Sequence, residues 1–287
     1  MTDETKENVN EAIGDLVEVA EQTVRHPYTK WLARFGFYTK GFLFIVIGLI
    51  AVSVAFGIRN IEIAAPAGAL TTIAQLPFGK LLLIVFIAGA IGHGVWNILR
   101  GAADIDDSGG GWQGITQRIF SASIGIFYLI LAWAAWNIII TSQLIYSDGE
   151  IPRTLTTLIL ALPLGTILMI LIGLGVVGAG VHECYSGISG KYKKNFRLHE
   201  MKKSKRVIIT LLGIFSFTAR ALIFALMGYF FIRAAINYNP NEAIGMDGAL
   251  LALSQTYYGK TLLFITAVGL ICHGILSLYE ARYRRIC

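Results

Sequence analysis

The stretch Gly79–Arg100, GKLLLIVFIAGAIGHGVWNILR, is apolar apart from one histidine set between two glycines and a few polar residues at its ends. Two further stretches share its pattern: Gly165–Ser186 reads GTILMILIGLGVVGAGVHECYS, and Gly259–Glu280 reads GKTLLFITAVGLICHGILSLYE. A repeat of about 90 residues has to be settled before any fold is assigned. Three sets of glycines coincide: Gly79, Gly165 and Gly259; Gly89, Gly175 and Gly269; Gly94, Gly180 and Gly274.

The composition is typical of a protein embedded in a membrane. Of the 287 residues, 55% are hydrophobic and only 15% are charged, and the mean hydropathy is +0.63. Soluble domains carry about 25% charged residues. Six apolar segments reach the roughly 20 residues that a membrane-spanning helix needs. These segments are 32–57, 80–101, 115–141, 158–187, 207–236 and 260–283. The sequence therefore predicts an all-α polytopic membrane protein with six transmembrane helices.

The six spans group into three units of two spans each. We place the first repeat at residues 30–103, the second at 112–190 and the third at 205–287. Two spans return the chain to the side on which it started, so all three units have the same orientation. Parallel repeats of this kind are related by an axis along the membrane normal.

Charge predicts the orientation. The formal net charge is +6, and the loop 187–206 alone holds eight Lys or Arg residues, with further arginines near the C-terminus. Loops rich in Lys and Arg remain in the cytoplasm. We therefore expect both termini in the cytoplasm. The same topology signal accounts for the positive charge without a nucleic-acid partner.

The N-terminal residues 1–29 differ from the rest of the chain. They are acidic, and Val9, Ile13, Leu16, Val17, Ala20 and Val24 recur at helical spacing. We expect an amphipathic cytoplasmic helix here. Because surface helices that bind anionic lipid are usually rich in Lys and Arg, its acidic face favours contact with the protein's own basic loop or with a partner.

Small residues recur along the spans at steps of seven, which is two helical turns. Glycines stacked on one face let neighbouring helices approach closely in lipid, where apolar burial does not drive association. We expect this packing role for one set of glycines: Gly41, Gly48, Gly89, Gly94, Gly125, Gly175, Gly180, Gly228, Gly269 and Gly274.

The first span carries AR-x-G-x4-G-x6-G (Ala33, Arg34, Gly36, Gly41 and Gly48), and Gly68-Ala69-Leu70 and Pro77-Phe78-Gly79 follow before the second span. With these motifs, the three tandem two-span units resemble a bacterial membrane family known as domain of unknown function 1206. The resemblance covers most of residues 30–285 and is closer in repeats one and three than in repeat two. It implies six helices in three repeats, in the plasma (inner) membrane of a bacterium, and carries no activity.

Four ionisable residues within the spans are candidates for a ligand or cofactor site: His93, His273, His182 and Arg220. Ionisable groups inside a membrane point to function by default. In one interpretation His93 and His273 hydrogen-bond neighbouring helices or each other and help to hold the bundle together. In a second, His93 and His273 ligate a b-type haem or related tetrapyrrole, since imidazole is a common axial ligand. In a third, Arg220, Lys40 and the histidines line a polar path for an anion or proton.

The sequence holds no recognisable enzyme signature. There is no nucleophile elbow, phosphate loop, HExxH or paired-carboxylate motif, and the three cysteines form no CxxC. We predict no metal site, no resident cofactor and no catalysis. The preferred hypothesis is a structural, accessory or scaffold subunit that contacts membrane lipids and other membrane proteins. A transporter or channel and a haem- or pigment-binding subunit remain the alternatives.

Overall fold

The computed structural model describes residues 27–58, 64–102, 111–141 and 149–284. In these ranges the regular structure is helical, apart from one isolated bridge between Phe196 and Arg284. The prediction of an all-α protein is therefore confirmed. The expected amphipathic helix lies almost wholly outside the described residues, as does the loop between the first two repeats.

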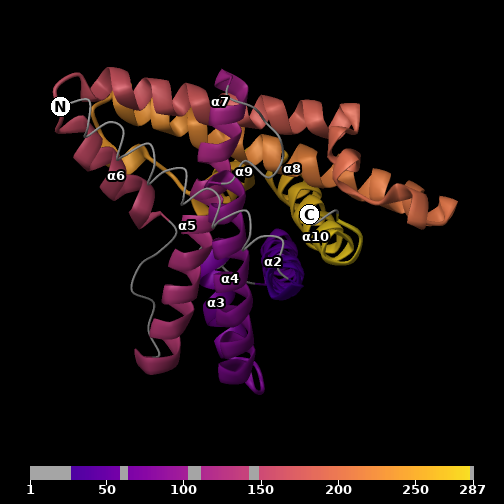
Figure 1. The fold of residues 1–287 in the computed structure, drawn as a ribbon. Coiled ribbons are helices and arrows are strands. Elements are labelled where there is room, and N and C mark those ends of the chain that lie inside the picture. Colours follow the sequence, from indigo (N-terminus) through magenta and orange to yellow (C-terminus); the bar gives the residue numbers. More distant parts are fainter. Residues whose placement is uncertain (1–26, 59–63, 103–110, 142–148, 285–287) are drawn as a thin grey trace, which may run out of the picture.

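Each repeat contains a long helix, a short helix and a second long helix (Figure 1). The first repeat has α2 (Pro27–Ala55), α3 (Pro66–Ala74) and α4 (Gly79–Ala102). The second has α5 (Trp112–Thr141), α6 (Glu150–Leu160) and α7 (Gly165–Ser189). The third has α8 (Lys203–Ile236), α9 (Met246–Ser254) and α10 (Gly259–Tyr283), with the 3-10 turns η2 (Lys191–Asn195), η3 (Leu198–Glu200) and η4 (Pro240–Glu242) beside them.

The six long helices are long and apolar enough to cross a membrane, as predicted. The fourth span begins later than expected, at Gly165 instead of residue 158, because the chain breaks between α6 and α7. Leu164 has a left-handed backbone there, with φ 62°, and Pro163 precedes it. Residues 158–160 belong to the separate short helix α6.

The first glycine of each second long helix marks a close approach. A Cβ at Gly79, Gly165 or Gly259 would collide with carbonyl groups at the end of the preceding short helix. Only glycine allows the chain to turn so tightly from a short helix into the next span. The repeated stretch in the sequence therefore begins with glycine for a structural reason.

The most extensive helix pairs join neighbouring repeats: α4 with α5, α7 with α8, and α10 with α2. At each crossing, small residues bring two backbones together. A Cβ on Gly41 would lie 2.8 Å from the Gly274 carbonyl, and a Cβ on Gly274 would lie 2.6 Å from the Gly41 carbonyl. The pairs Gly94–Gly125 and Gly180–Ala221 hold equivalent positions at the other two crossings. In Figure 1, α4 and α5 run down the picture, α7 and α8 run across its upper part, and α2 is seen nearly end-on.

Packing within a repeat is not the same in all three. The first repeat packs α2 on α4 and the third packs α8 on α10, whereas no comparable contact between α5 and α7 exists in the second. Gly89 and Gly269 lie at the interfaces within repeats one and three, but Gly175 has nothing within 4 Å of a Cβ built on it. The structure therefore does not show the packing expected for Gly175, because α7 lies away from α5.

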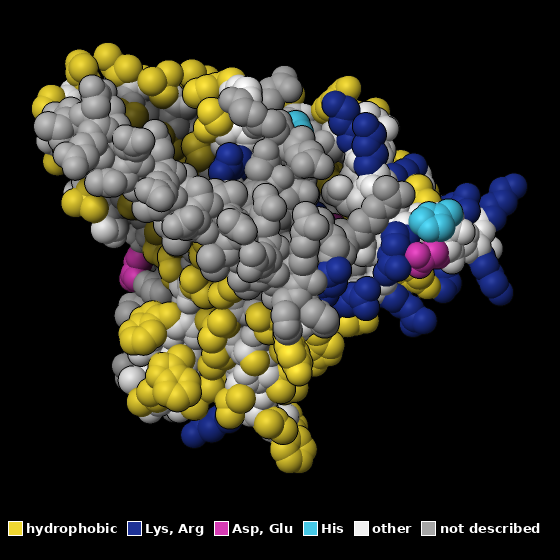
Figure 2. Space-filling model, viewed as in Figure 1, with side chains coloured by type: hydrophobic (Ala, Val, Ile, Leu, Met, Phe, Trp, Pro, Cys, Tyr) yellow, Lys and Arg dark blue, Asp and Glu magenta, His cyan; other side chains and the backbone are white. Residues whose placement is uncertain are grey.

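The main core lies where α2, α4, α5 and α10 meet the short helices α3 and α9. Its fully buried members include Leu43, Leu70, Leu83, Leu131 and Leu250. Much of the outer surface is also apolar, as a lipid-facing surface must be (Figure 2). Lys and Arg side chains gather instead at one end of the view in Figure 2.

Candidate functional site

Arg220, the candidate cation of the fifth span, is paired across the α7–α8 contact. Its Nη2 lies 2.9 Å from Oε1 of Glu183, and the two side chains are 20% and 10% exposed. The guanidinium also lies 5.7 Å from the Phe217 ring centre and 5.9 Å from that of Phe224. An aromatic face attracts a cation at such distances. Arg220 therefore contributes to the packing of α7 on α8.

A second group of charges lies on the α2–α10 pair. Glu280 receives a hydrogen bond from Arg284 at 2.9 Å and lies 3.8 Å from Nζ of Lys40. The Arg284 guanidinium also lies 5.0 Å from the ring centre of Phe37. Lys40 and Arg220 hold equivalent positions in repeats one and three. Each of these two cations lies near a carboxylate from a neighbouring helix.

His273 connects α10 to α8. Its Nδ1 lies 2.8 Å from the hydroxyl of Ser216, and its ring meets that of Phe44 edge-on at 4.6 Å between centres. A neutral imidazole has one donor and one acceptor, which suits a hydrogen bond between helices. This arrangement agrees with the interpretation in which the histidine holds the helices together.

His93, the equivalent residue of repeat one, has different neighbours. Its ring meets Phe37 at 5.0 Å and Tyr128 at 4.5 Å, both edge-on. Its Cβ lies directly over Gly36 of α2, and its buried Nδ1 has no hydrogen-bond partner in the part of the chain that the structure describes. Within these ring and hydrogen-bond contacts, the two histidines share no neighbour.

The space beside the glycines that flank the histidines is occupied by neighbouring helices. A Cβ on Gly92 would meet Leu32, one on Gly94 would meet the Gly125 carbonyl, and one on Gly274 would meet the Gly41 carbonyl. Haem ligation would instead need these glycines to leave room for a flat ring. Among residues 27–58, 64–102, 111–141 and 149–284, no group of three His, Cys, Asp or Glu could hold a metal ion.

His182 is exposed, whereas its neighbour Glu183 is buried. In the structure, Glu183 is the partner of Arg220. Glu280, which was not among the predicted site residues, is the partner of Lys40. One signal could have found both. A cation inside a span needs a counter-charge, and both glutamates lie near the same end of an even-numbered span.

The segment between α7 and α8 is folded against the end of α10. We call residues 190–206 the basic platform. Phe196 pairs with Arg284 in an isolated bridge, and the Arg197 amide donates to the Tyr283 carbonyl at 2.9 Å. Tyr192 donates to the backbone carbonyls of Ile209 and Thr210, both at 3.2 Å. Burial raises the pKa of the Tyr192 phenol.

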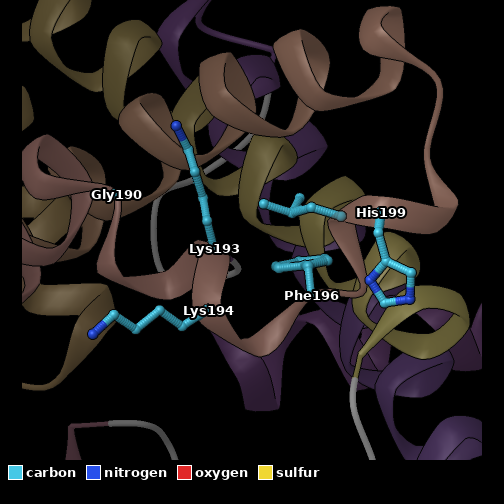
Figure 3. A pocket seen from close by; sticks show the side chains of 6 residues that line it. Gly190, Lys193, Lys194, Phe196 and His199 are labelled. Atoms are coloured by element: carbon cyan, nitrogen blue, oxygen red, sulfur yellow. The ribbon is translucent and has the colours of Figure 1, made fainter.

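Two surface cavities are prominent in the described residues. One, of about 560 Å³, lies on the basic platform and is lined by Gly190, Lys193, Lys194, Phe196, Leu198 and His199 (Figure 3). The other, of about 400 Å³, lies between α4 and α5 beside Arg118, whose guanidinium donates to the carbonyls of Gly101 and Ala102. Neither cavity includes Arg220 or the two buried histidines.

Six apolar helices in three repeats, with ion pairs between them, define a polytopic α-helical membrane protein. A family model described as Domain of Unknown Function (DUF1206) matches residues 35–104, 120–190 and 215–284, and the chain belongs to this family. The three matches confirm the resemblance and the three-repeat architecture.

One relative is similar along most of its length. It is the "Uncharacterized protein YxxB" of Bacillus subtilis (strain 168), which is 31% identical over 263 residues, covering 91% of this chain and 93% of the relative. No solved structure matches the chain.

Proposed function

We propose that this membrane protein is a structural or accessory subunit, a scaffold that acts through contacts with other membrane proteins or lipids, and not an enzyme. The observation that carries the proposal is that buried ionisable groups, with His93 as the exception, pair with polar or charged groups of neighbouring helices. Three such pairs join neighbouring helices: Arg220 with Glu183, Lys40 with Glu280, and His273 with Ser216. Buried polar groups used in this way specify one arrangement of helices.

We place the protein in the bacterial plasma membrane with the basic platform in the cytoplasm. The support is the charge of the platform, since cytoplasmic loops carry the excess of Lys and Arg. In a variant without native cysteines, Ser204→Cys should react with an impermeant thiol reagent only after the cells are opened. Tyr257→Cys, at the other end of the bundle and 93% exposed, should react in intact cells. Reversed labelling would overturn this orientation.

The scaffold proposal is tested in two ways on the purified full-length protein. In liposomes, proton and anion fluxes should equal those of empty vesicles. From its host, the tagged protein should retain a partner in fixed stoichiometry through purification in mild detergent. Flux above the control that is abolished by Arg220→Met would refute the scaffold role.

A transport role is the second candidate, and one observation favours it. Nδ1 of His93 and Oε2 of Glu183 are buried without hydrogen-bond partners in the part of the chain that the structure describes. Unsatisfied buried polar atoms are uncommon and need an explanation, such as unseen water. Water at both atoms would supply part of a path for protons or anions. The liposome measurement above separates this role from the scaffold role.

We propose no resident cofactor. A haem-binding subunit would require His93 and His273 to ligate the ring, and the absorption spectrum of the purified protein tests it directly. A Soret band that disappears in both His93→Ala and His273→Ala would support haem ligation. A colourless protein from haem-replete cells would exclude it.

A further inference from the structure

The cavity on the basic platform combines an apolar floor with positive charge. Phe196 and Leu198 supply apolar lining, which we call its floor, and Lys193 and Lys194 supply positive charge. Figure 3 shows the two lysines on one side of Phe196 and His199 on the other. In the described ranges neither lysine takes part in an ion pair. The cavity therefore fits an occupant that is both apolar and acidic.

The beginning of α2 lies at the same end of the molecule as this cavity. Phe37 of α2 is in contact with Arg284, and Arg284 is bridged to Phe196 on the platform. From Phe37 back to Pro27, α2 extends by ten residues, or about 15 Å at 1.5 Å per residue. Pro27, where α2 begins, is thus at the same end of the molecule as the basic platform.

The residues before α2 have the matching chemistry. Residues 4–24 contain six Asp or Glu and one Lys, against eight Lys or Arg and one Glu in residues 190–206. At helical spacing, Ile13, Leu16, Val17 and Ala20 fall on one face, and the acidic residues fall largely on the other. A helix of 21 residues would be about 30 Å long, enough to cross the platform.

We propose that residues 4–24 dock on the basic platform, with Leu16 in the cavity against Phe196 and Leu198 and with acidic residues at the border of the apolar face, such as Glu21, beside Lys193 and Lys194. The docked segment neutralises much of the platform's charge and covers its apolar floor. It competes there with any anionic partner, whether lipid or protein. The proposal does not depend on the scaffold role.

A cysteine pair tests this docking in the full-length protein. In a background with Cys184, Cys272 and Cys287 replaced by Ser, Leu16→Cys and Leu198→Cys should form an intramolecular disulfide under mild oxidation in neutral-lipid nanodiscs. Disulfides require Cβ atoms within about 4.5 Å, so the bond reports a close contact. Asp15→Cys with Leu198→Cys is the matched control, since residue 15 points away from residue 16 on a helix.

Charge reversal distinguishes a docked segment from a chance collision. Lys193→Glu with Lys194→Glu should slow disulfide formation about fivefold, because two exposed ion pairs are worth about 1 kcal/mol together. Lys202→Glu with Lys203→Glu, outside the cavity, should have less effect. Absence of the disulfide, a bond only between two copies, or equal rates for the facing and control pairs would each overturn the proposal. Anionic vesicles that bind the full chain as tightly as a chain lacking residues 1–24 would also overturn it.

A second inference rests on the asymmetry between repeats. In repeats one and three, a glycine of the second long helix lies against a small residue of the first. In repeat two the corresponding glycine faces open space and the corresponding serine is exposed. The three equivalent pairs are Gly89 with Thr39, Gly269 with Ala219, and Gly175 with Ser123. Gly178, the equivalent of Gly92, also has nothing within 4 Å.

At the next contact along these helices, the large and the small residue have exchanged places between the two helices of repeat two. In repeat one, His93 fits against Gly36, and in repeat three His273 fits against Ser216. The equivalent positions in repeat two hold Ala179 on the second helix and Phe120, 42% exposed, on the first. The large side chain has moved to the opposite helix, so the pair would still fill one contact between α5 and α7. Volume-conserving exchanges are the ones that close packing tolerates best.

We infer that α5 and α7 close on each other as α2 and α4 do, with Ser123 against Gly175 and Phe120 against Ala179. Figure 1 shows α7 running across the picture away from α5, so this contact is not made in the structure. Closure would complete the third interface within a repeat and join α5 to α7 around the axis of the three repeats. It would also remove exposed apolar side chains of both helices from lipid.

Crosslinking of the full-length protein tests closure. In the background without native cysteines, Ser123→Cys with Gly175→Cys should form an intramolecular disulfide, while Ser123→Cys with Leu174→Cys should not. Gly178→Leu should abolish the first crosslink without lowering the melting temperature, because residue 178 is crowded only in the closed form. No crosslink, a crosslink only between two copies, or a crosslink unaffected by Gly178→Leu would each overturn closure.

Discussion

Separating Arg220 from Glu183 should destabilise the protein more than removing both. At 2.9 Å the Coulomb attraction between the charges is about 6 kcal/mol for an effective dielectric constant of about 20. Burial of two charges costs several kcal/mol each, so the intact pair contributes little net stability. Arg220→Met leaves the Glu183 carboxylate buried alone, and one of its oxygens already lacks a partner. We expect a loss of about 3–5 kcal/mol.

The assay is a double-mutant cycle on the free energy of unfolding in mixed detergent micelles. Glu183→Leu alone should also be costly, because it leaves the guanidinium without its counter-charge. The double variant, Arg220→Met with Glu183→Leu, should lie within about 1 kcal/mol of the parent, since both charges are gone and the volume is largely kept. Strictly additive losses would refute the reasoning, since they would show that the two side chains do not interact.

Three further predictions follow from individual contacts. His273→Asn should lower the melting temperature less than His273→Leu, because Asn keeps a polar partner for α8; equal losses would count against the hydrogen bond. Gly274→Leu should cost about 1–3 kcal/mol by forcing α2 from α10, whereas Gly111→Leu, with nothing within 4 Å, should be neutral. A hydrogen bond from Asn237 holds the pKa of the Glu242 carboxyl below its usual range. The ionised carboxylate therefore stabilises the fold above a pH of about 4, and this stabilisation is lost as the pH falls through the lowered pKa. Glu242→Gln should flatten the acid side of the melting curve, and an unchanged curve would contradict this.

Much of the architecture could be predicted from the sequence because it depends on composition and period. Six apolar segments long enough to cross a bilayer need no tertiary information, since lipid leaves the backbone no partner outside a helix. The recurrence of Gly79, Gly165 and Gly259 placed the three repeats in register. The structure explains that recurrence through the tight turn from each short helix. The late start of α7 was missed because residues 158–164 are as apolar as a span, and the break is marked by the left-handed backbone at Leu164.

The pairing of buried groups was decided by the tertiary structure alone. Arg220 and Glu183 are 37 residues apart, and Lys40 and Glu280 come from opposite ends of the chain. Which cation meets which carboxylate depends on the packing of α7 on α8 and of α10 on α2. His93 and His273 look equivalent in the sequence. His273 nevertheless has a hydrogen-bond partner in Ser216, whereas His93 lies against Gly36, which has no side chain to offer one. The sequence by itself determined which residues must be buried in the membrane, since hydrophobicity is a local property. The contacts among them depend on how whole helices cross, which a periodic pattern does not contain.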